Sequence, residues 1–176
     1  MAFVVQQDTP VASANSYVAV ADFKAYHADR GNTFTAEDTA IEQALVKATD
    51  YLDTRFRFVG CRDTKDQTTE WPRDHAYDDR GDNVEGVPQA VKDATCEYAL
   101  RAISADLLSD PTRDATGRAI KSKSESVGPI KESVEYAYDG QVFQLPEYPS
   151  ADRLLFARKL VLRRSAGIGG GIVGRG

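Results

Sequence analysis

One stretch of this sequence constrains the fold more than any other. Between Thr35 and Phe56, apolar residues recur at i, i+4, i+7, i+11 and i+15, namely Ile41, Leu45, Ala48, Leu52 and Phe56. This spacing places them on one face of a helix. Thr35 is suited to cap that helix, and Asp38 follows at the capping-box position. We therefore predict a helix over residues 35–56 that buries this face against neighbouring elements.

A second helix is predicted over residues 88–108. Pro88 stands at a favourable first helical position, and the segment ends before Pro111. Its apolar residues form two stripes, one of Val91, Thr95, Tyr98 and Ala102 and the other of Cys96, Leu100, Ile103 and Leu107. A helix that is apolar on two sides needs more than one neighbour. It is either central to a bundle or packed against another subunit.

The remaining elements are shorter. A helix is expected near residues 18–31, and another is expected from a Ser150 cap to Gly167, with Arg163 and Arg164 in its last turn. Alternation of apolar residues predicts a β-hairpin at about 124–138, with Gly128 and Pro129 at its turn. The polar residues 109–126 are interpreted as a mobile loop.

Together these signals predict a mainly α fold, a small bundle of three to four helices with a short β-hairpin and extended N- and C-terminal arms. We expect one helical domain over residues 1–166, with a long loop at 59–86, and a flexible glycine-rich tail at 167–176. A loop of that length is usually functional or partly disordered.

Charge is distributed unevenly along the chain. The net charge of the 176 residues is −5, which argues against general affinity for nucleic acid. From Arg153 to the end there are six Lys and Arg and no acidic residue, which leaves −11 for the preceding residues. The basic end is therefore a separate electrostatic region. The N-terminus lacks the features of a signal peptide and no apolar run is long enough to span a membrane, so we expect a soluble protein without membrane contact.

Residues that could support chemistry are few. His27 shares a helix face with Val20 and Phe23 and is expected to be packed, while His75 lies among aspartates that match no calcium-loop spacing. Cys61 and Cys96 have no metal-site spacing, and a reduced structural role is favoured over a disulfide. The terminal glycines lack the strand and helix that a phosphate loop needs. We predict neither enzyme activity nor a metal or other cofactor.

Trp71, the only tryptophan, lies in a charged loop beside Pro72 and Arg73. Trp and Arg are enriched at interface hot spots, so one interpretation places these residues at a subunit interface, together with Tyr98 and Ile103. The alternative is that Trp71 folds back over its own core. Both interpretations stay open at the level of the sequence.

Several blocks resemble the small head-to-tail connector, or adaptor, proteins of tailed bacteriophages, whose relatives often carry a DnaT-like single-stranded-DNA-binding label. The blocks are NSYVAVADFKAYHADRGN, AIEQALVKATDYLDTRFRFVGCR, EWPR and VPQAVKDATCEYALRA, in order over roughly residues 13–105, with SVGPIKESVEYA as a weaker match. The resemblance implies a structural protein of the virion neck, assembled in the host cytoplasm as a dodecameric ring. The ring would lie beneath the portal protein, extend the DNA channel without sequence-specific binding, and carry the next neck or tail protein.

This resemblance also implies that the C-terminal segment contacts the portal. The residues expected to do so are Arg163, Arg164, Ile168, Ile172, Val173 and Arg175. The alternative function is that of a phage or prophage single-stranded-DNA-binding protein, which requires a positive groove with stacking aromatic residues. Candidates for stacking are Phe56, Phe58, Trp71 and Tyr77. Their segment is acidic, which counts against this alternative.

Overall fold

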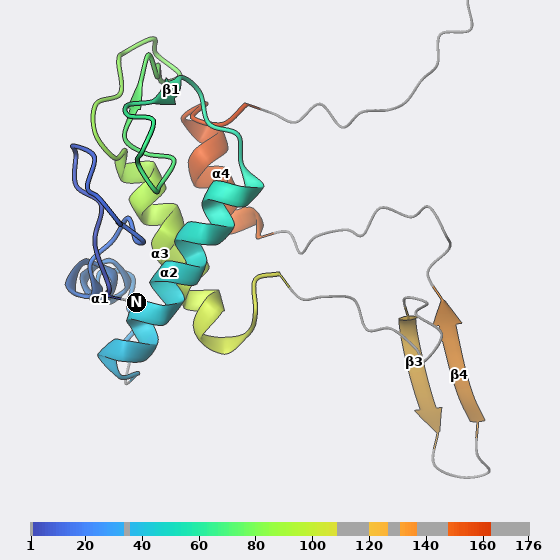
Figure 1. Ribbon diagram of the computed structural model, residues 1–176. Helices are drawn as coiled ribbons and strands as arrows, with labels where there is room; N and C mark the ends of the chain where they lie inside the picture. Colours follow the sequence, from blue (N-terminus) through green and yellow to red (C-terminus); the bar gives the residue numbers. More distant parts are fainter. Residues whose placement is uncertain (1, 34–35, 109–119, 127–130, 137–147, 163–176) are drawn as a thin grey trace, which may run out of the picture. The chain divides into compact units, whose positions relative to one another are not determined.

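The computed structural model describes residues 2–33, 36–108, 120–126, 131–136 and 148–162 (Figure 1). It groups the chain into two compact units, one of Met1–Leu107 with Glu147–Gly176 and one of Leu108–Pro146. The single domain expected over 1–166 spans both units. The fold class is confirmed, since the described residues form four helices and a two-stranded hairpin.

The first unit contains the four helices. They are α1 (Val20–Ala28), α2 (Asp38–Arg55), α3 (Gln89–Ser104) and α4 (Pro149–Ala157). Helix α3 packs against both α2 and α4, and α1 contacts α2 and α3. Figure 1 shows α2 and α3 running side by side. The hydrophobic core is formed where these helices meet.

Helix α2 follows the sequence pattern closely. Ile41, Leu45, Ala48 and Leu52 are all buried in the core. The N-cap residue is Glu37, which makes no side-chain capping bond, and the expected cap Thr35 lies outside the described residues. The periodicity of the apolar face is therefore a sounder signal here than the capping box.

Helix α3 is central to the bundle. This agrees with one of the two interpretations of its two apolar stripes, the other being contact with a second subunit. Its buried residues are Val91, Ala94, Thr95, Cys96, Tyr98, Ala99 and Ala102. One set of neighbours comes from α2 and another from α4. Pro88 is the N-cap, one position before its predicted place.

Helix α4 ends at Ala157, so the prediction of a helix reaching Gly167 is wrong over residues 158–162. Lys159 has a φ of 53°, which breaks the helical path, and Leu160 and Val161 then turn into the core. Their backbone runs antiparallel to the start of the long loop: Val59 N donates to Leu160 O over 3.0 Å, and Leu162 N donates to Arg57 O over 2.7 Å. An antiparallel bridge between Phe58 and Val161 therefore holds this stretch outside the helix. Residues 163–167 lie outside the described part of the chain.

The long loop at 59–86 is packed against the helices. It contains two short antiparallel strands, β1 (Cys61–Arg62) and β2 (Arg73–Asp74), and it buries Gln67, Thr69, Trp71, Pro72 and Ala76. Gly60 has a φ of 72°, and a Cβ there would lie 2.4 Å from Asp74 O. Glycine is therefore required where the two strands approach each other. We call residues 59–86 the Trp71 loop.

A polar network joins the Trp71 loop to α2 and to the N-terminal arm. The Asp53 carboxylate accepts hydrogen bonds from the Tyr17 hydroxyl, over 2.6 Å, and from Glu70 N, over 3.0 Å. The Tyr17 oxygen accepts from Trp71 N over 3.1 Å. Burial raises the pKa of Asp53 from 3.8 to about 7, although both hydrogen bonds oppose the increase. A buried carboxyl therefore positions this loop.

The second unit contains the hairpin of β3 (Ile120–Ser126) and β4 (Lys131–Tyr136), which pair antiparallel. Its register runs from Ile120 opposite Tyr136 to Ser126 opposite Lys131, with an irregularity between Ile120 and Ser122. The predicted hairpin is confirmed, but it begins at Ile120, so residues 120–126 are a strand rather than part of a loop. Residues 109–119 and the expected turn at 127–130 lie outside the described residues.

Candidate functional site

Cations of the first unit fall into two groups. Arg55, Arg73 and Arg101 make ion pairs with Asp152, Glu70 and Glu97. In contrast, Arg57, Arg153, Arg158 and Lys159 are exposed, and none of the four makes an ion pair with another described residue. We call Arg153, Arg158 and Lys159 the α4 basic segment. Arg57 adjoins this segment because its carbonyl is bonded to Leu162 N.

Asp152 is the one acidic residue of α4, and its charge is turned inward. Its side chain is 11% exposed and lies 2.8 Å from Arg55 Nη2, and it also accepts a hydrogen bond from the Tyr98 hydroxyl. Burial together with this carboxylate raises the pKa of Tyr98, so the phenol stays protonated. The Arg55–Asp152–Tyr98 cluster fixes α4 on α2 and α3. Because the one acid of α4 is turned inward, the charged residues on the outer surface of α4 are all basic.

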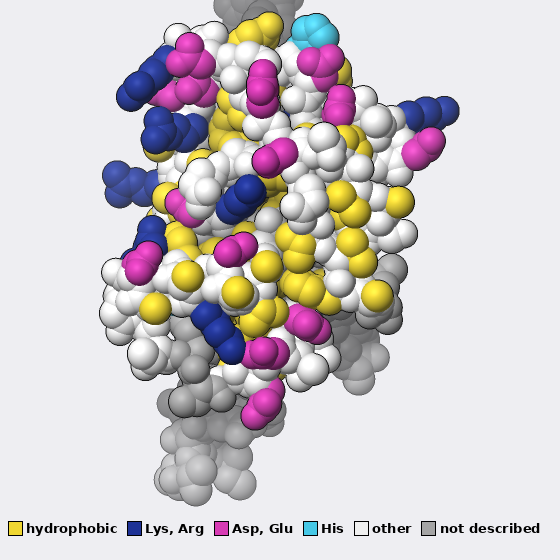
Figure 2. All heavy atoms as spheres, turned by 90° about the vertical axis from the view of Figure 1, so that its left-hand side faces the viewer, with side chains coloured by type: hydrophobic (Ala, Val, Ile, Leu, Met, Phe, Trp, Pro, Cys, Tyr) yellow, Lys and Arg dark blue, Asp and Glu magenta, His cyan; other side chains and the backbone are white. Residues whose placement is uncertain are grey.

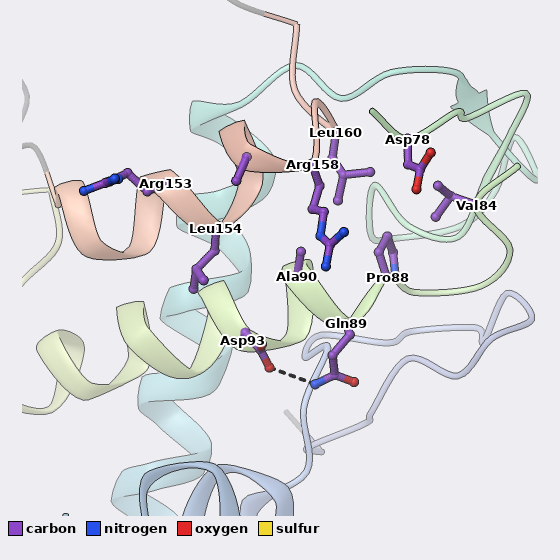
Figure 3. A pocket seen from close by; sticks show the side chains of 11 residues that line it. Asp78, Val84, Pro88, Gln89, Ala90, Asp93, Arg153, Leu154, Arg158 and Leu160 are labelled. Carbon is purple, nitrogen blue, oxygen red and sulfur yellow. Dashed lines mark hydrogen bonds between the residues drawn. The ribbon is translucent and has the colours of Figure 1, made fainter. Parts of the chain in front are cut away.

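Beside the α4 basic segment is a groove of about 480 Å³, shown in Figure 3. We call it the α4 groove. It is lined by Arg153, Leu154, Ala157, Arg158 and Leu160 from the α4 side, by Pro88, Gln89, Ala90 and Asp93 from α3, and by Asp78 and Val84 from the Trp71 loop. Arg158 extends from α4 toward Ala90, whereas Arg153 points away from it.

The α4 groove contains both acidic and basic side chains, and each of its two acids accepts hydrogen bonds from a neighbouring group. The amino end of α3 lies on one wall, with no side-chain cap and no acid in its first turn, and such an end attracts anions. The Asp78 carboxylate accepts hydrogen bonds from Arg80 N and Asp82 N, and these bonds lower its pKa. Asp93 accepts one from Gln89 Nε2 over 2.8 Å. Arg158 extends toward the amino end of α3, and Arg153 lines the groove farther along α4.

Two exposed aromatic side chains are next in sequence to residues that line this groove. Phe156 is 39% exposed, and its ring centroid is 6.0 Å from that of the half-buried Phe56. Because residues three and four apart are neighbours on a helix, Phe156 lies beside Arg153, which in turn lies beside Ala157 of the groove. Tyr77, next to Asp78, is 52% exposed. The surface therefore combines cations, a groove and stacking rings.

A different face of the first unit is more evenly charged. Figure 2 shows it with many Lys and Arg along the left edge and others near the middle and at the right, with Asp and Glu beside them in each place and patches of exposed hydrophobic side chains between them. A hollow of about 750 Å³ between the N-terminal arm, α1 and α3 carries Asp22, Asp29 and Asp93 together with Arg30 and Lys92. Opposite charges are interspersed there, unlike in the α4 basic segment.

The residues singled out in the sequence have these positions. Trp71, Pro72 and Tyr98 are buried within their own chain, which agrees with the alternative that Trp71 covers its own core, and such side chains cannot reach a second subunit without rearrangement. Arg73 is bonded to Val59 O, Gly60 O and Glu70, and Ile103 is half-buried. The six residues expected to contact a portal, Arg163, Arg164, Ile168, Ile172, Val173 and Arg175, lie outside the described residues.

The four aromatic residues proposed from the sequence to stack on bases differ in how exposed their side chains are. Trp71 and Phe58 are buried and in ring contact at 5.7 Å, Phe56 is half-buried, and Tyr77 alone is well exposed. Phe156 and Arg57 were missed. The run of cations after Arg153 is the signal that could have directed attention to them, because it marks the surface on which α4 presents its outer residues.

The histidines and cysteines have simple environments. His27 is buried, its Nε2 lies 3.2 Å from Cys96 O, and burial lowers its pKa. His75 is exposed beside Asp74. Cys61 is exposed and Cys96 buried, both as free thiols, and burial raises the pKa of Cys96 to about 12. Within the described ranges there is no cluster of three metal-ligating side chains and no helix able to cross a bilayer.

Comparison with known proteins gives a family match. A family model with the description "Putative DnaT-like ssDNA binding protein" matches residues 1–173. Neither the curated proteins nor the solved structures contain a match to this chain.

Proposed function

The chain belongs to the family described as "Putative DnaT-like ssDNA binding protein", and on this premise we propose that it binds single-stranded DNA through the α4 groove and the residues around it. The family match over nearly the whole chain is the observation that carries the proposal. The exposed cations and rings of the first unit supply a surface of suitable chemistry.

This family assignment corrects the main functional expectation from the sequence. A structural adaptor under a portal was expected, with single-stranded-DNA binding as the alternative. The family description names single-stranded DNA, and it favours the alternative. Nothing in the comparisons supports a ring, a portal partner or a virion neck. The net charge of the chain and the acidity of residues 56–77 count against DNA binding, but a strand would contact a local surface, and the α4 basic segment supplies cations there.

The electrostatic part of the proposal rests on the unpaired cations. Arg57, Arg153, Arg158 and Lys159 need not break an ion pair with a described residue before they contact phosphate. Each such contact releases counterions from the strand and contributes affinity that falls with salt. Arg163, Arg164 and Arg175 add charge of the same sign in the sequence that follows.

Base stacking is assigned to Phe156 and Tyr77, the exposed rings that precede the groove residues Ala157 and Asp78 in the sequence. Stacking on an aromatic face contributes about 1–3 kcal/mol per base and tolerates any base. A strand bound to this surface would therefore contact both cations and rings, which is the combination expected of a single-strand binder.

A titration of labelled thymidylate oligonucleotide at increasing salt tests the proposal. With four phosphate contacts, the slope of log K against log salt is expected to be about −3. The variant Arg153→Gln/Arg158→Gln should bind more weakly and reduce the magnitude of that slope by about 1.4. The matched control is Lys65→Gln/Arg80→Gln, which removes two exposed cations of the Trp71 loop that make no ion pair with a described residue.

Two results would refute the proposal. One is the absence of single-strand binding at low salt, and the other is an equal loss of affinity in both double variants. The second result would show that charge in general, and not the α4 groove, attracts the strand. Far-ultraviolet circular dichroism of both variants should match the wild type, because all four side chains are exposed.

A further inference from the structure

We propose that Lys159 contacts a phosphate of the bound strand just outside the α4 groove, and that this contact accounts for a lysine at a backbone position that favours glycine. The inference rests on the proposed function and assigns a separate role to one residue of the same surface. Arg158 lines the groove and extends toward Ala90 (Figure 3). Lys159, the next residue, is exposed and does not line the groove.

Lys159 occupies the position at which helix α4 ends. Its N–H donates to Phe156 O over 3.2 Å, and Leu160 N donates to Leu155 O over 3.3 Å. Together with the φ of 53° at Lys159, these two bonds form the Schellman motif, in which the residue in the left-handed conformation is usually glycine. Both bonds are made by backbone atoms, so glycine could form the same motif.

A lysine at this position lowers the stability of the fold. In the left-handed region the Cβ of an L-residue lies too close to the following carbonyl oxygen, and glycine avoids this cost. The Lys159 side chain is exposed and makes no ion pair with another described residue that would offset the cost. A cation near the end of a helix is favourable, but Arg158 already supplies one at this end.

The surroundings of Lys159 suit it for binding an anion. Its backbone is held on one side by α4 and on the other by the two hydrogen bonds that join residues 160 and 162 to residues 57 and 59. A side chain on a fixed backbone loses less freedom on binding than one on a segment that must first be ordered. Arg57 and Arg158 are exposed and have no ion-pair partner among the described residues, so they add attraction for phosphate beside Lys159.

Substitutions at Lys159 separate binding from stability. Lys159→Gln removes one phosphate contact and keeps a side chain in the left-handed conformation. It should weaken binding of a thymidylate oligonucleotide about fivefold at about 0.1 M salt and leave the Tm within about 1 °C of the wild type. Lys159→Gly should weaken binding by the same factor but raise the Tm by about 2–4 °C. Lys159→Arg keeps the charge and should bind as tightly as the wild type.

Lys65 provides the matched control. It is an exposed cation of the Trp71 loop that makes no ion pair with another described residue, and its φ is not positive. Lys65→Gln should leave the affinity nearly unchanged, and Lys65→Gly should not raise the Tm.

The outcomes separate this inference from the proposed function. If wild-type protein binds no oligonucleotide, the proposed function fails and the role of Lys159 with it. If Arg153→Gln/Arg158→Gln loses affinity and Lys159→Gln does not, single-strand binding stands and the inference is overturned. A loss of affinity in Lys159→Gly alone would also overturn it, because the backbone conformation and not the charge would then be responsible. A Tm of Lys159→Gly no higher than that of the wild type would do the same, because lysine would then carry no cost at this position.

Discussion

The Trp71 loop and the α4 region both combine aromatic residues with arginines, yet they use them in opposite ways. In the Trp71 loop the ring of Trp71 is fully buried, and Arg73 beside it is bonded to the Glu70 carboxylate and to three backbone carbonyls. In the α4 region Phe156 is exposed, and Arg153 and Arg158 have no ion-pair partner among the described residues. The same residue types thus support structure in one place and present a binding surface in the other.

What separates the two regions is whether each polar group has a partner inside the fold. A buried polar group without one is costly, so the Trp71 loop is held by a continuous network through Tyr17 and Asp53. On α4 the only paired charge is Asp152, and it faces the core. Mutations in the first region should therefore change stability, and mutations in the second should change binding.

The largest expected effect is on Trp71. Trp71→Ala removes a fully buried ring and should lower the free energy of unfolding by about 3–5 kcal/mol in urea titrations. Phe156→Ala is the matched change on α4 and should cost about 1 kcal/mol or less, because the side chain is already partly in water. Equal losses in the two variants would contradict the comparison.

The buried ion pair of α4 comes next. Asp152→Ala leaves Arg55 without its carboxylate at a site where both side chains are mostly buried, and it should cost about 3 kcal/mol of unfolding free energy. Asp38→Ala breaks the exposed pair with Lys24 and should cost less than about 1 kcal/mol. Urea denaturation of both variants would check this, and a small effect of Asp152→Ala would mean that α4 is not fixed by this cluster.

A pH effect of intermediate size is expected from Asp53. Its pKa is raised to about 7 in the folded state, so the folded protein holds a proton that the unfolded chain releases near pH 4. The free energy of unfolding should therefore fall as pH rises from about 5 to 7, by up to about 1.4 kcal/mol per pH unit from this group. Asp53→Asn should flatten that part of the stability curve. An unchanged slope in the variant would assign the proton to another group.

The smallest expected effect concerns affinity. Phe156→Ala should weaken binding of a thymidylate oligonucleotide by about 1–2 kcal/mol through the loss of one stacking ring. Its salt dependence should stay as in the wild type, since no cation is removed. Fluorescence anisotropy across a salt series measures both quantities. Phe56→Leu, at the half-buried ring that contacts Phe156, is the control and should alter affinity less.

The fold could be predicted from the sequence where apolar residues recur at helical spacing over several turns. The apolar stripe of α2 and the two apolar stripes of α3 predicted a helical bundle and a central helix. Residues buried on one or two faces of a helix recur at regular spacing in the sequence, so such helices can be predicted. The end of α4 was not predictable, since residues 158–162 keep an apolar pattern that suits a helix. What decides their conformation is pairing with residues 57–59, a contact between segments about one hundred positions apart.

The site was predictable only in part. Charge counting marked the basic end at Arg153, but the chosen residues were those after Leu162, and the sequence gives no sign that Arg57 adjoins α4. For Trp71 the sequence left two interpretations open, a subunit interface and the protein's own core. Hydrogen bonds from its loop to Tyr17 and Asp53, which allow the loop to be buried, could not be foreseen from the sequence.

The short antiparallel contact between Phe58 and Val161 has a mechanical consequence. A force applied to the chain beyond Leu162, such as the pull of a strand held by its arginines, would first load the backbone bonds to Arg57 and Val59 and the buried side chains of Leu160 and Val161. The load would pass into the hydrophobic centre of the first unit, and α4 would be shielded from unwinding.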